Sequence, residues 1–432
     1  MLRKAKMNWN KSKLKDLLVH VVDNRGKTPP LSDRGVELIE TNALVGNNKF
    51  PNYGVVRKHV SRQTYETWFR SGHPIKGDIL IATVGVNFGS VAIMRENRGC
   101  VAQNLVALRV NKEKINPDFL YYFLSWERTQ LYLKNLDIGA AQPSIKVPHL
   151  LDIDVPIPDI QIQYKISAIL SAYDDLIENN TRRIQILEEI AQLIYQEWFV
   201  NFRFPGYGKV RFVNSELGKI PEGWEVKPLE DIADLYRGRS YRSSDLQGNN
   251  CLPFFNLKNI QKGGGFRSEG TKLFSGKFSE EQIARTGDIL IAVTDMTQER
   301  NVVARVARVP KLKFDFGIFS MDLVRIEPRG GISKDWLYCM LRYSTFSDEV
   351  KEYANGVNVL HLSPDRIKEY RVLVPANGLQ KQFGQIIKNI FLLIDNFYEK
   401  NENLKKTRDI LVPKLISGEI DVANLDIIAK EF

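Results

Sequence analysis

The longest periodic pattern of apolar residues covers residues 162–198. Apolar side chains recur there at steps of three and four, and no glycine or proline occurs between residues 160 and 204. This spacing predicts an amphipathic helix of about 40 residues, about 60 Å long. A second pattern of this kind runs from Phe383 to Leu415, and we expect Pro413 to kink or end that helix.

An offset of 217 residues aligns the two patterns, so that Asn179 corresponds to Asn396. A long helix with a narrow apolar stripe needs a partner helix, and the obvious partner is its own copy. We therefore predict that the helices pair as an antiparallel coiled coil about their middles, near these two asparagines. The predicted pairing core consists of Ile169, Leu176, Ile177, Leu187, Ile194, Ile386, Leu393, Ile394, Leu404 and Leu411.

The two longer segments have a different pattern, with short β-rich runs separated by turn signals. The clearest runs are 79–83, 101–110, 289–294 and 302–309. Each segment also has one helical stretch, near Asp118–Leu133 and Asp335–Tyr353. These patterns predict mixed α/β globules.

An internal repeat relates the two halves of the chain. Gly77–Ala82, with the sequence GDILIA, recurs unchanged as Gly287–Ala292, and other short matches keep the same order at offsets of 210 to 217. The chain is therefore two copies of one unit. We predict an α+β fold in which two homologous globular domains (1–158 and 204–376) are joined by two long helical segments (159–203 and 377–432), with an internal pseudo-twofold repeat.

Charge separates the globular segments from the helical ones. The net charge is +10 over 432 residues, with +9 in residues 1–158 and +5 in 201–375, but −4 in 159–200 and zero in 376–432. Basic domains joined to non-basic helices indicate a polyanion site and a separate protein-contact site, or simply solubilising charge. The three cysteines form no CxxC pair and no apolar run follows the basic N-terminus, so we expect a cytoplasmic protein.

The sequence contains no convincing catalytic constellation. The five histidines form no metal-like pair, and no Gly-x-Ser-x-Gly elbow or complete phosphate loop occurs. The cofactor turn and Asn/Asp-Pro-Pro-aromatic loop of a DNA methyltransferase are also missing. We therefore expect a binding protein without a metal site or a cofactor of its own.

The helical segments resemble those of the specificity subunits of type I restriction–modification enzymes. Residues 163–180 are similar to the family's first repeat helix, 196–202 to the end of that helix, and 407–420 to its C-terminal signature. The GDIL sequence and its copy are usual in the family's recognition domains. The resemblance covers nearly the whole chain and is most specific in the helices.

This resemblance implies a subunit without catalytic activity, in which each globular domain reads one half of a split, asymmetric target in double-stranded DNA. The helices would hold the two domains apart and dock two methyltransferase subunits, and two motor-nuclease subunits can join. S-adenosylmethionine, ATP and Mg²⁺ would then belong to the partner subunits.

Base reading needs Arg or Lys for guanine and Asn or Gln for adenine, placed on loops that reach base edges. The repeat selects matched positions, and residues shared by both copies are expected to hold phosphate, whereas base readers should differ between copies. The candidates in the first copy are Arg25, Lys27, Thr28, Asn42, Gln142, Ser144 and Lys146. Those in the second copy are Arg237, Arg239, Ser240, Asn256, Lys258, Asn259, Asn358 and His361.

Two other classes of function remain open. The first is an enzyme, either a fused methyltransferase or a nuclease, against which the missing motifs count. The second is a scaffold that binds proteins across a coiled-coil spacer. A steep fall in DNA affinity with salt, together with a site preference, would distinguish a DNA reader from such a scaffold.

Overall fold

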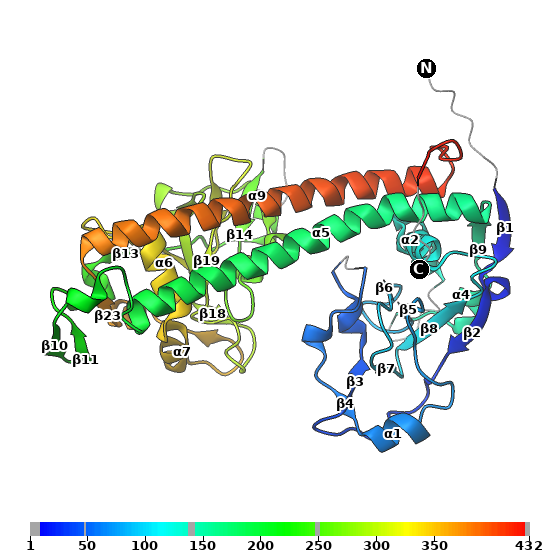
Figure 1. Ribbon diagram of the computed structural model, residues 1–432, viewed down its shortest axis with the longest axis horizontal. Coiled ribbons are helices and arrows are strands. Elements are labelled where there is room, and N and C mark those ends of the chain that lie inside the picture. Colours follow the sequence, from blue (N-terminus) through cyan, green and yellow to red (C-terminus); the bar gives the residue numbers. More distant parts are fainter. Residues whose placement is uncertain (1–8, 47–48, 137–142, 247–250, 428–432) are drawn as a thin grey trace. The chain divides into compact units, whose positions relative to one another are not determined.

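The computed structural model of the chain describes residues 9–46, 49–136, 143–246 and 251–427. The chain forms two compact units: unit 1 consists of residues 1–179 and 401–432, and unit 2 of residues 180–400. Two long helices, α5 (Ile160–Tyr195) and α9 (Asn377–Ile416), each contribute one part to each unit (Figure 1).

Unit 1 contains a four-stranded antiparallel sheet in the order β2-β8-β5-β6. These strands are β2 (Leu18–Val22), β8 (Leu105–Val110), β5 (Ile79–Ala82) and β6 (Val91–Ile93). A second sheet has the order β4-β3-β7, in which β3 and β7 are parallel. Its strands are β4 (His59–Val60), β3 (Val36–Ile39) and β7 (Cys100–Val101). Separately, β1 (Asn10–Lys13) pairs with β9 (Asp154–Ile157).

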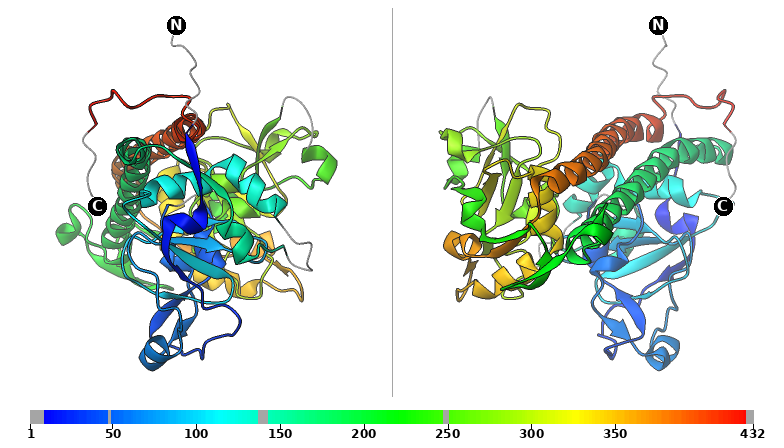
Figure 2. Two further views of the ribbon diagram at one scale, coloured as in Figure 1. Left: turned by 90° about the vertical axis from the view of Figure 1, so that its right-hand side faces the viewer. Right: turned by 60° about the vertical axis from the view of Figure 1, so that its left-hand side comes forward.

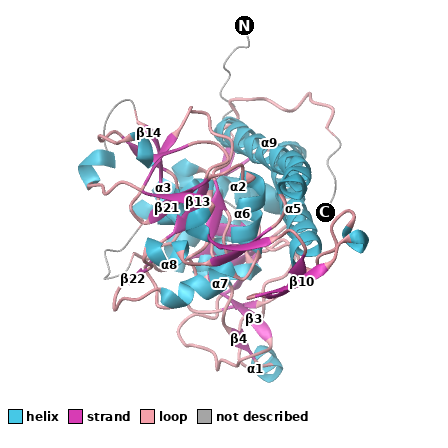
Figure 3. Ribbon diagram, turned by 90° about the vertical axis from the view of Figure 1, so that its left-hand side faces the viewer, coloured by secondary structure: helices cyan, strands magenta, loops and turns pink. Residues whose placement is uncertain are grey.

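Unit 2 repeats this topology in the order β13-β21-β17-β19. The strands are β13 (Ala233–Arg237), β21 (Leu323–Pro328), β17 (Ile289–Ala292) and β19 (Val306–Arg308). Helix α6 (Lys334–Tyr343) contacts β19 and β21 of this sheet. Helix α6 and strand β21 are labelled in Figure 3.

The second sheet of unit 2, β15-β14-β20-β16, again contains a parallel pair, β14 with β20. Its strands are β15 (Lys272–Phe274), β14 (Leu252–Phe255), β20 (Gly317–Phe319) and β16 (Ile283–Ala284). The pair β12 (Glu225–Pro228) with β23 (Arg371–Val374) corresponds to β1 with β9. Unit 2 adds β10 (Phe212–Ser215) with β11 (Gly218–Pro221), and β18 (Thr294–Asp295) with β22 (Leu360–His361). The shared topology confirms the predicted repeat.

The repeated GDILIA sequence forms the central strand of each main sheet. Ile79 and Ile81 belong to the cluster that packs beneath the helices, whereas Leu80 and Ala82 belong to the cluster on the opposite face. Unit 2 places Ile289–Ala292 in the same alternating way. An uninterrupted apolar run is needed here because both faces of the strand are buried.

The Gly-Asp pair before each central strand builds the turn that precedes it. Gly77 has φ +87° and Gly287 has φ +86°, a backbone conformation that glycine adopts without strain. The Asp78 carboxylate accepts the Ile75 N–H at 2.9 Å and pairs with the Arg109 guanidinium at 2.8 Å. The equivalent Asp288 accepts the Arg285 N–H and pairs with Lys334, each at 2.8 Å.

The shorter helices differ from the sequence prediction in where they end. The stretch predicted near Asp118–Leu133 is two helices, α2 (Pro117–Ser125) and α3 (Glu127–Asn135), because Trp126 between them is extended with ψ 131°. Its counterpart is α6, followed by α7 (Phe346–Val350). Three further helices are α1 (Arg62–Thr67), α4 (Val147–Leu151) and α8 (Pro364–Lys368).

Both long helices are present. Helix α5 ends in a single π-helical turn, Gln196–Val200. Helix α9 continues through Pro413 to Ile416, and Gly418, with φ +73°, lies just beyond its end. Glycine suits this position because the chain can turn away from the helix there in the left-handed conformation.

The two helices are antiparallel within each unit (Figure 2). In unit 1, Asp174 pairs with Arg408, while the later Ile177 accepts a hydrogen bond from the earlier Asn401 at 3.3 Å. In unit 2, the Arg183 guanidinium lies over the Phe397 ring, and Tyr195 packs edge-on against Phe383. Residue numbers rise on one helix as they fall on the other, which confirms the predicted antiparallel pairing.

The buried stripe of the helices differs from the predicted pairing core. Leu176, Ile386 and Leu393 are 50%, 40% and 48% exposed, so the prediction is wrong for these three. Ile394 is buried, and six members are half-buried: Ile169, Ile177, Leu187, Ile194, Leu404 and Leu411. The fully buried positions include Ile166, Leu170, Ala191, Phe383 and Ile387. The stripe is rotated because each helix packs on its globular domain as well as on the other helix.

The asparagines at the middle of the helices also differ by a few positions from those predicted. Asn179 and Asn396 are exposed, whereas Asn180 and Asn401 are buried. The asparagines buried near the mid-point are therefore Asn180 and Asn401.

Candidate nucleic-acid interface

Four loops of each unit lie at the same end of the main sheet. In unit 2, residues 237–242 follow β13 and residues 293–303 follow β17. Residues 319–322 precede β21, and residues 355–361 lead into β22. In unit 1 the corresponding residues are 25–28, 83–87, 102–104 and 143–146. We call these segments the reading loops of each unit.

Backbone hydrogen bonds join the reading loops of unit 2. The Arg239 N–H donates to Phe319 O at 2.7 Å, and the Met321 N–H donates to Arg239 O at 2.9 Å. The Val293 N–H donates to Asp322 O at 2.8 Å, and strand β18 pairs with β22 through Thr294 and His361. The loops therefore form one connected surface.

Gly238 permits the closest approach in this surface. A Cβ atom at this position would lie 2.1 Å from Ser320 O, so the backbones can meet only with glycine there. This explains physically why the turn reads Arg-Gly-Arg.

Unit 1 joins its reading loops in a similar way. The Gln103 Nε2 donates to the Thr28 hydroxyl at 2.5 Å, and the Thr83 N–H donates to Asn104 O at 2.8 Å. The Ile145 N–H donates to Thr83 O at 2.9 Å. The fold thus brings the loop of Lys27 and Thr28 and the loop of Ser144 and Lys146 to one place.

Four cations of the described reading loops have no acidic partner, whereas Arg25 and Arg300 in the same loops are each paired with a carboxylate. Among the residues that the structure describes, Arg237, Arg239, Arg242 and Lys27 form no ion pair, and Arg239 Nε is buried without a hydrogen-bond partner. Most later arginines of unit 2 are paired with carboxylates: Arg285, Arg300, Arg305, Arg308, Arg325, Arg329, Arg366 and Arg371. Unpaired cations gathered on loops are what phosphate binding requires.

Three sequence candidates have structural partners instead. The Arg25 guanidinium makes two hydrogen bonds of 2.8 Å to the Asp23 carboxylate, which also keeps the pKa of Asp23 below its ordinary value. Arg25 therefore holds its own turn.

Asn256 and Asn259 are 4% and 0% exposed, and each caps the same turn. The Asn256 amide donates to Gly270 O at 2.8 Å, and the Asn259 amide donates to Arg267 O at 2.9 Å. The prediction that these two asparagines read bases is wrong, because their amides are buried and used within the loop.

The remaining candidates are accessible. Those exposed on the surface are Lys27, Thr28, Asn42, Lys146, Arg237, Ser240, Lys258, Asn358 and His361. Arg239 and Ser144 are half-buried, and Ser144 forms a β-bridge with Val84. Asn42 lies on a turn (Thr41–Leu44) beside β5, and Lys258 lies on the turn that Asn256 and Asn259 build. Gln142 lies outside the described residues.

Three residues of the reading loops were not among the candidates selected from the sequence. Arg242 continues the unpaired arginines, Met296 is 68% exposed at the loop after β17, and Gln103 adopts φ +54° beside Thr28. Arg242 has no cationic counterpart at the matched place in the first copy, so the repeat did not select it. Met296 follows the repeated GDILIA by four residues, which was the available signal.

Other kinds of site were also sought within the described residues. No group of three or more His, Cys, Asp or Glu side chains there could hold a metal ion. No helix in those ranges is both long and apolar enough to span a membrane.

Comparison with known proteins agrees with this arrangement. The family described as the type I restriction modification DNA specificity domain matches residues 6–189 and again residues 221–406. The MjaIX specificity subunit of a type I restriction enzyme from Methanocaldococcus jannaschii is 28% identical over 358 residues, which cover 81% of this chain and 79% of the relative. The MjaVIII specificity subunit from the same organism is 25% identical over 359 residues, 81% of each chain.

A crystal structure of the S subunit of a type I restriction–modification system from M. genitalium has a similar fold. Its TM-score is 0.53 at 18% identity, over 96% of this chain and 97% of the other. Together, the two matched domains show that this chain belongs to the type I restriction–modification DNA specificity family. The function of such a subunit is to recognise DNA targets. The homologues of this chain are the non-catalytic specificity subunits of restriction–modification complexes. The predicted family, fold class and DNA-recognition function are confirmed.

Proposed function

We propose that each unit reads one half of a split, asymmetric target in double-stranded DNA through its reading loops. The carrying observation is that both copies of the repeat gather their loops at the same end of the main sheet, with different side chains in each copy. Equal frameworks that carry unequal readers suit two unequal half-sites.

The cations shared by the two copies are assigned to phosphates. Lys27 and Arg239 occupy matched places, and both lack an acidic partner among the described residues. Arg237 and Arg242 extend this charge in unit 2. A phosphate contact contributes affinity irrespective of sequence, so each such change should reduce the salt dependence of binding by about one unit of slope.

The base readers are assigned to the late loops, where the copies differ. Lys146 in unit 1 is a donor for guanine, and Asn358 in unit 2 is suited to adenine. Asn358 lies in the exposed segment that leads into β22, next to His361, which is paired with Thr294. Ser144, Ser240 and His361 complete the polar surface around these two readers.

The exposed leucines of the helices are assigned to methyltransferase docking. Leu176 on α5 and Leu393 on α9 are equivalent in the repeat, and they are 50% and 48% exposed. An apolar side chain exposed at the same place in each copy suits one partner bound twice, so we expect two methyltransferase subunits. Two motor-nuclease subunits can join this assembly, and S-adenosylmethionine, ATP and Mg²⁺ are then bound by the partners, in the cytoplasm.

A methylation map tests the proposal. The chain is expressed with its methyltransferase partner in a host that lacks DNA methylation, and N6-methyladenine is located by long-read sequencing. The expected result is a split, asymmetric motif that disappears when this chain is omitted. A soluble complex that adds no methylation would count against DNA reading and favour the scaffold.

Native mass spectrometry tests the docking assignment. Leu176→Glu and Leu393→Glu should each reduce the number of bound methyltransferase subunits from two to one, because a charge replaces an apolar contact. Gln385→Glu, at another exposed position on α9, is the matched control and should leave both subunits bound. Two bound subunits in both leucine variants would overturn the assignment.

A further inference from the structure

An apolar side chain projects from the reading loops of unit 2. Met296 is 68% exposed, and it follows strand β18 in the loop after the central strand. Single exposed apolar residues are ordinary on protein surfaces. Two further exposed apolar residues lie in the adjoining reading loops, since Met321 is 38% and Val357 is 91% exposed.

Hydrogen bonds connect these loops to one another. The Gln298 side chain, two residues after Met296, donates to Val357 O at 2.7 Å. Met321 donates its N–H to Arg239 O at 2.9 Å. These three apolar residues therefore lie on loops of the same connected surface as the unpaired Arg239.

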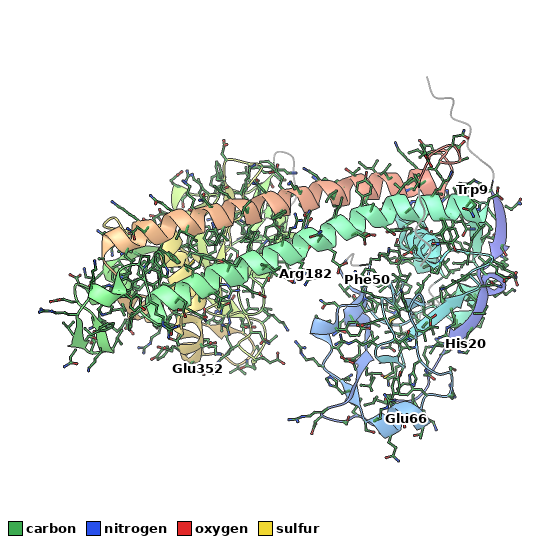
Figure 4. The ribbon with its side chains drawn as sticks, in the orientation of Figure 1. Trp9, His20, Phe50, Glu66, Arg182 and Glu352 are labelled. Carbon is green, nitrogen blue, oxygen red and sulfur yellow. The ribbon has the colours of Figure 1, made fainter. Side chains whose placement is uncertain are left out.

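Side-chain hydrogen bonds hold the loop that carries Met296 in one conformation. The Asp295 side chain is 2% exposed, and its carboxylate accepts the Thr297 N–H at 2.9 Å and the Val302 N–H at 2.7 Å. Burial alone would raise the pKa of Asp295, but these hydrogen bonds hold it below its ordinary value, so the carboxylate stays charged. Further along, Arg300 pairs with Glu352 at 2.6 Å. Glu352 is labelled in Figure 4.

For a methionine on such a hydrogen-bonded loop of a DNA-reading surface, the DNA offers a specific chemical partner. In the major groove, thymine is the base that presents a methyl group, and apolar side chains contact it. The unbranched, polarisable methionine adapts well to such a contact. Val86, at the matched place in unit 1, is also apolar and is 96% exposed.

We propose that Met296 recognises the 5-methyl group of a thymine in the half-site read by unit 2. The proposal rests on the proposed function, since it assigns one base contact within that recognition. It makes Met296 a specificity-determining residue that hydrogen-bond reasoning from the sequence does not identify.

Deoxyuridine substitution tests this contact directly, because uracil differs from thymine only in lacking the methyl group. The full chain, in complex with its methyltransferase, is bound to DNA that carries the mapped target, and each thymine is replaced by uracil in turn. We expect the wild type to lose about fourfold in affinity at one thymine of a single half-site, which is the factor for one buried methylene-sized group. With Met296→Ala, binding to the thymine target weakens and this uracil effect disappears.

Leu217→Ala is the matched control. Leu217 is another exposed apolar residue of unit 2, at 51%, but it lies between β10 and β11, outside the reading loops. It should keep the full uracil effect. A uracil effect that is equal in Met296→Ala and the wild type overturns the proposal, as does a half-site without any sensitive thymine. If instead no split target is bound at all, the proposed function itself has failed.

Discussion

Replacing Arg408 should destabilise unit 1 through the charge that it leaves behind. Arg408 on α9 is 8% exposed, and its guanidinium pairs with the Asp174 carboxylate of α5 at 2.5 Å. Asp174 is 7% exposed and also accepts a hydrogen bond from the Tyr122 hydroxyl. Burial, together with the nearby charge of Asp174, raises the pKa of Tyr122 well above its ordinary value, so the hydroxyl remains a donor.

The size of the effect follows from this burial. Arg408→Met keeps most of the apolar stem but leaves Asp174 buried with one neutral donor. Removing one partner of a buried ion pair typically costs about 3–5 kcal/mol, whereas replacing both partners by apolar groups is often nearly neutral. We therefore expect the single variant to lose about 3–5 kcal/mol, and Asp174→Leu with Arg408→Met to lose much less.

Hydrogen exchange of the α5 segment 163–179 is the suitable assay, because it reports the stability of this helix pair without assuming that the whole chain unfolds in one step. Arg366→Met is the matched control, since Arg366 pairs with Glu369 on the surface and such a pair contributes at most about 1 kcal/mol. A loss under 1 kcal/mol in Arg408→Met, or losses that simply add in the double variant, would refute the reasoning.

The same ion pair makes the pairing of the helices selective. At the matched positions of unit 2, Phe391 replaces Asp174 and Ala191 replaces Arg408, and both are buried. Two copies of α5 paired together would place Asp174 opposite Ala191, and two copies of α9 would place Arg408 opposite Phe391. Only α5 against α9 pairs the charges, so a buried ion pair here favours the native partner helix over self-association.

Three further outcomes follow from the loops of unit 2. Asn259→Ala should lose about 1–3 kcal/mol of stability in urea unfolding, because buried partners such as Arg267 O lose their donor, while Lys258→Ala on the same turn changes little. Gly238→Ala should destabilise unit 2 and weaken DNA binding, because the added Cβ would collide with Ser320 O. Gly378→Ala on α9 is the control, since its Cβ would lie in open space, and equal melting temperatures of the two variants would contradict the prediction. Asp295→Asn should speed hydrogen exchange in residues 295–304 at pH 7. The pKa of Asp295 is lower in the folded protein, so its carboxylate stabilises the loop above the ordinary carboxyl pKa of 3.8, and this stability is lost as the pH falls through the folded pKa. No difference in exchange at pH 7 would exclude this role.

The sequence predicted the repeat, the central strands and the long helices because each has a local signature. GDILIA predicted a strand in both copies, and uninterrupted steps of three and four predicted α5 and α9. The face that each helix buries was less predictable, since it depends on packing against the globular domains. Leu176 and Leu393 fit a helix–helix stripe in sequence, yet both are exposed.

In the reading loops, too, the sequence predicted features with a local signature but not those that depend on tertiary contacts. The repeat selected Lys27 and Arg239 as candidates because a cation occupies both matched positions. It could not show that Arg25 is held by Asp23, or that Asn256 and Asn259 face inward, because amide and guanidinium groups serve turns as readily as DNA. Met296 was missed because a search for hydrogen-bonding readers passes over apolar residues.

Binding to DNA with randomised half-sites tests most directly that each unit reads one half of the target. The complex of the full chain with its methyltransferase is used as wild type, as Lys146→Ala and as Asn358→Ala, and bound DNA is sequenced. We predict that Lys146→Ala relaxes base preference in one half-site only and Asn358→Ala in the other only, with Arg366→Ala unchanged. Loss of preference in both halves from either change, or in neither half from both, would contradict the division of the target between the two units.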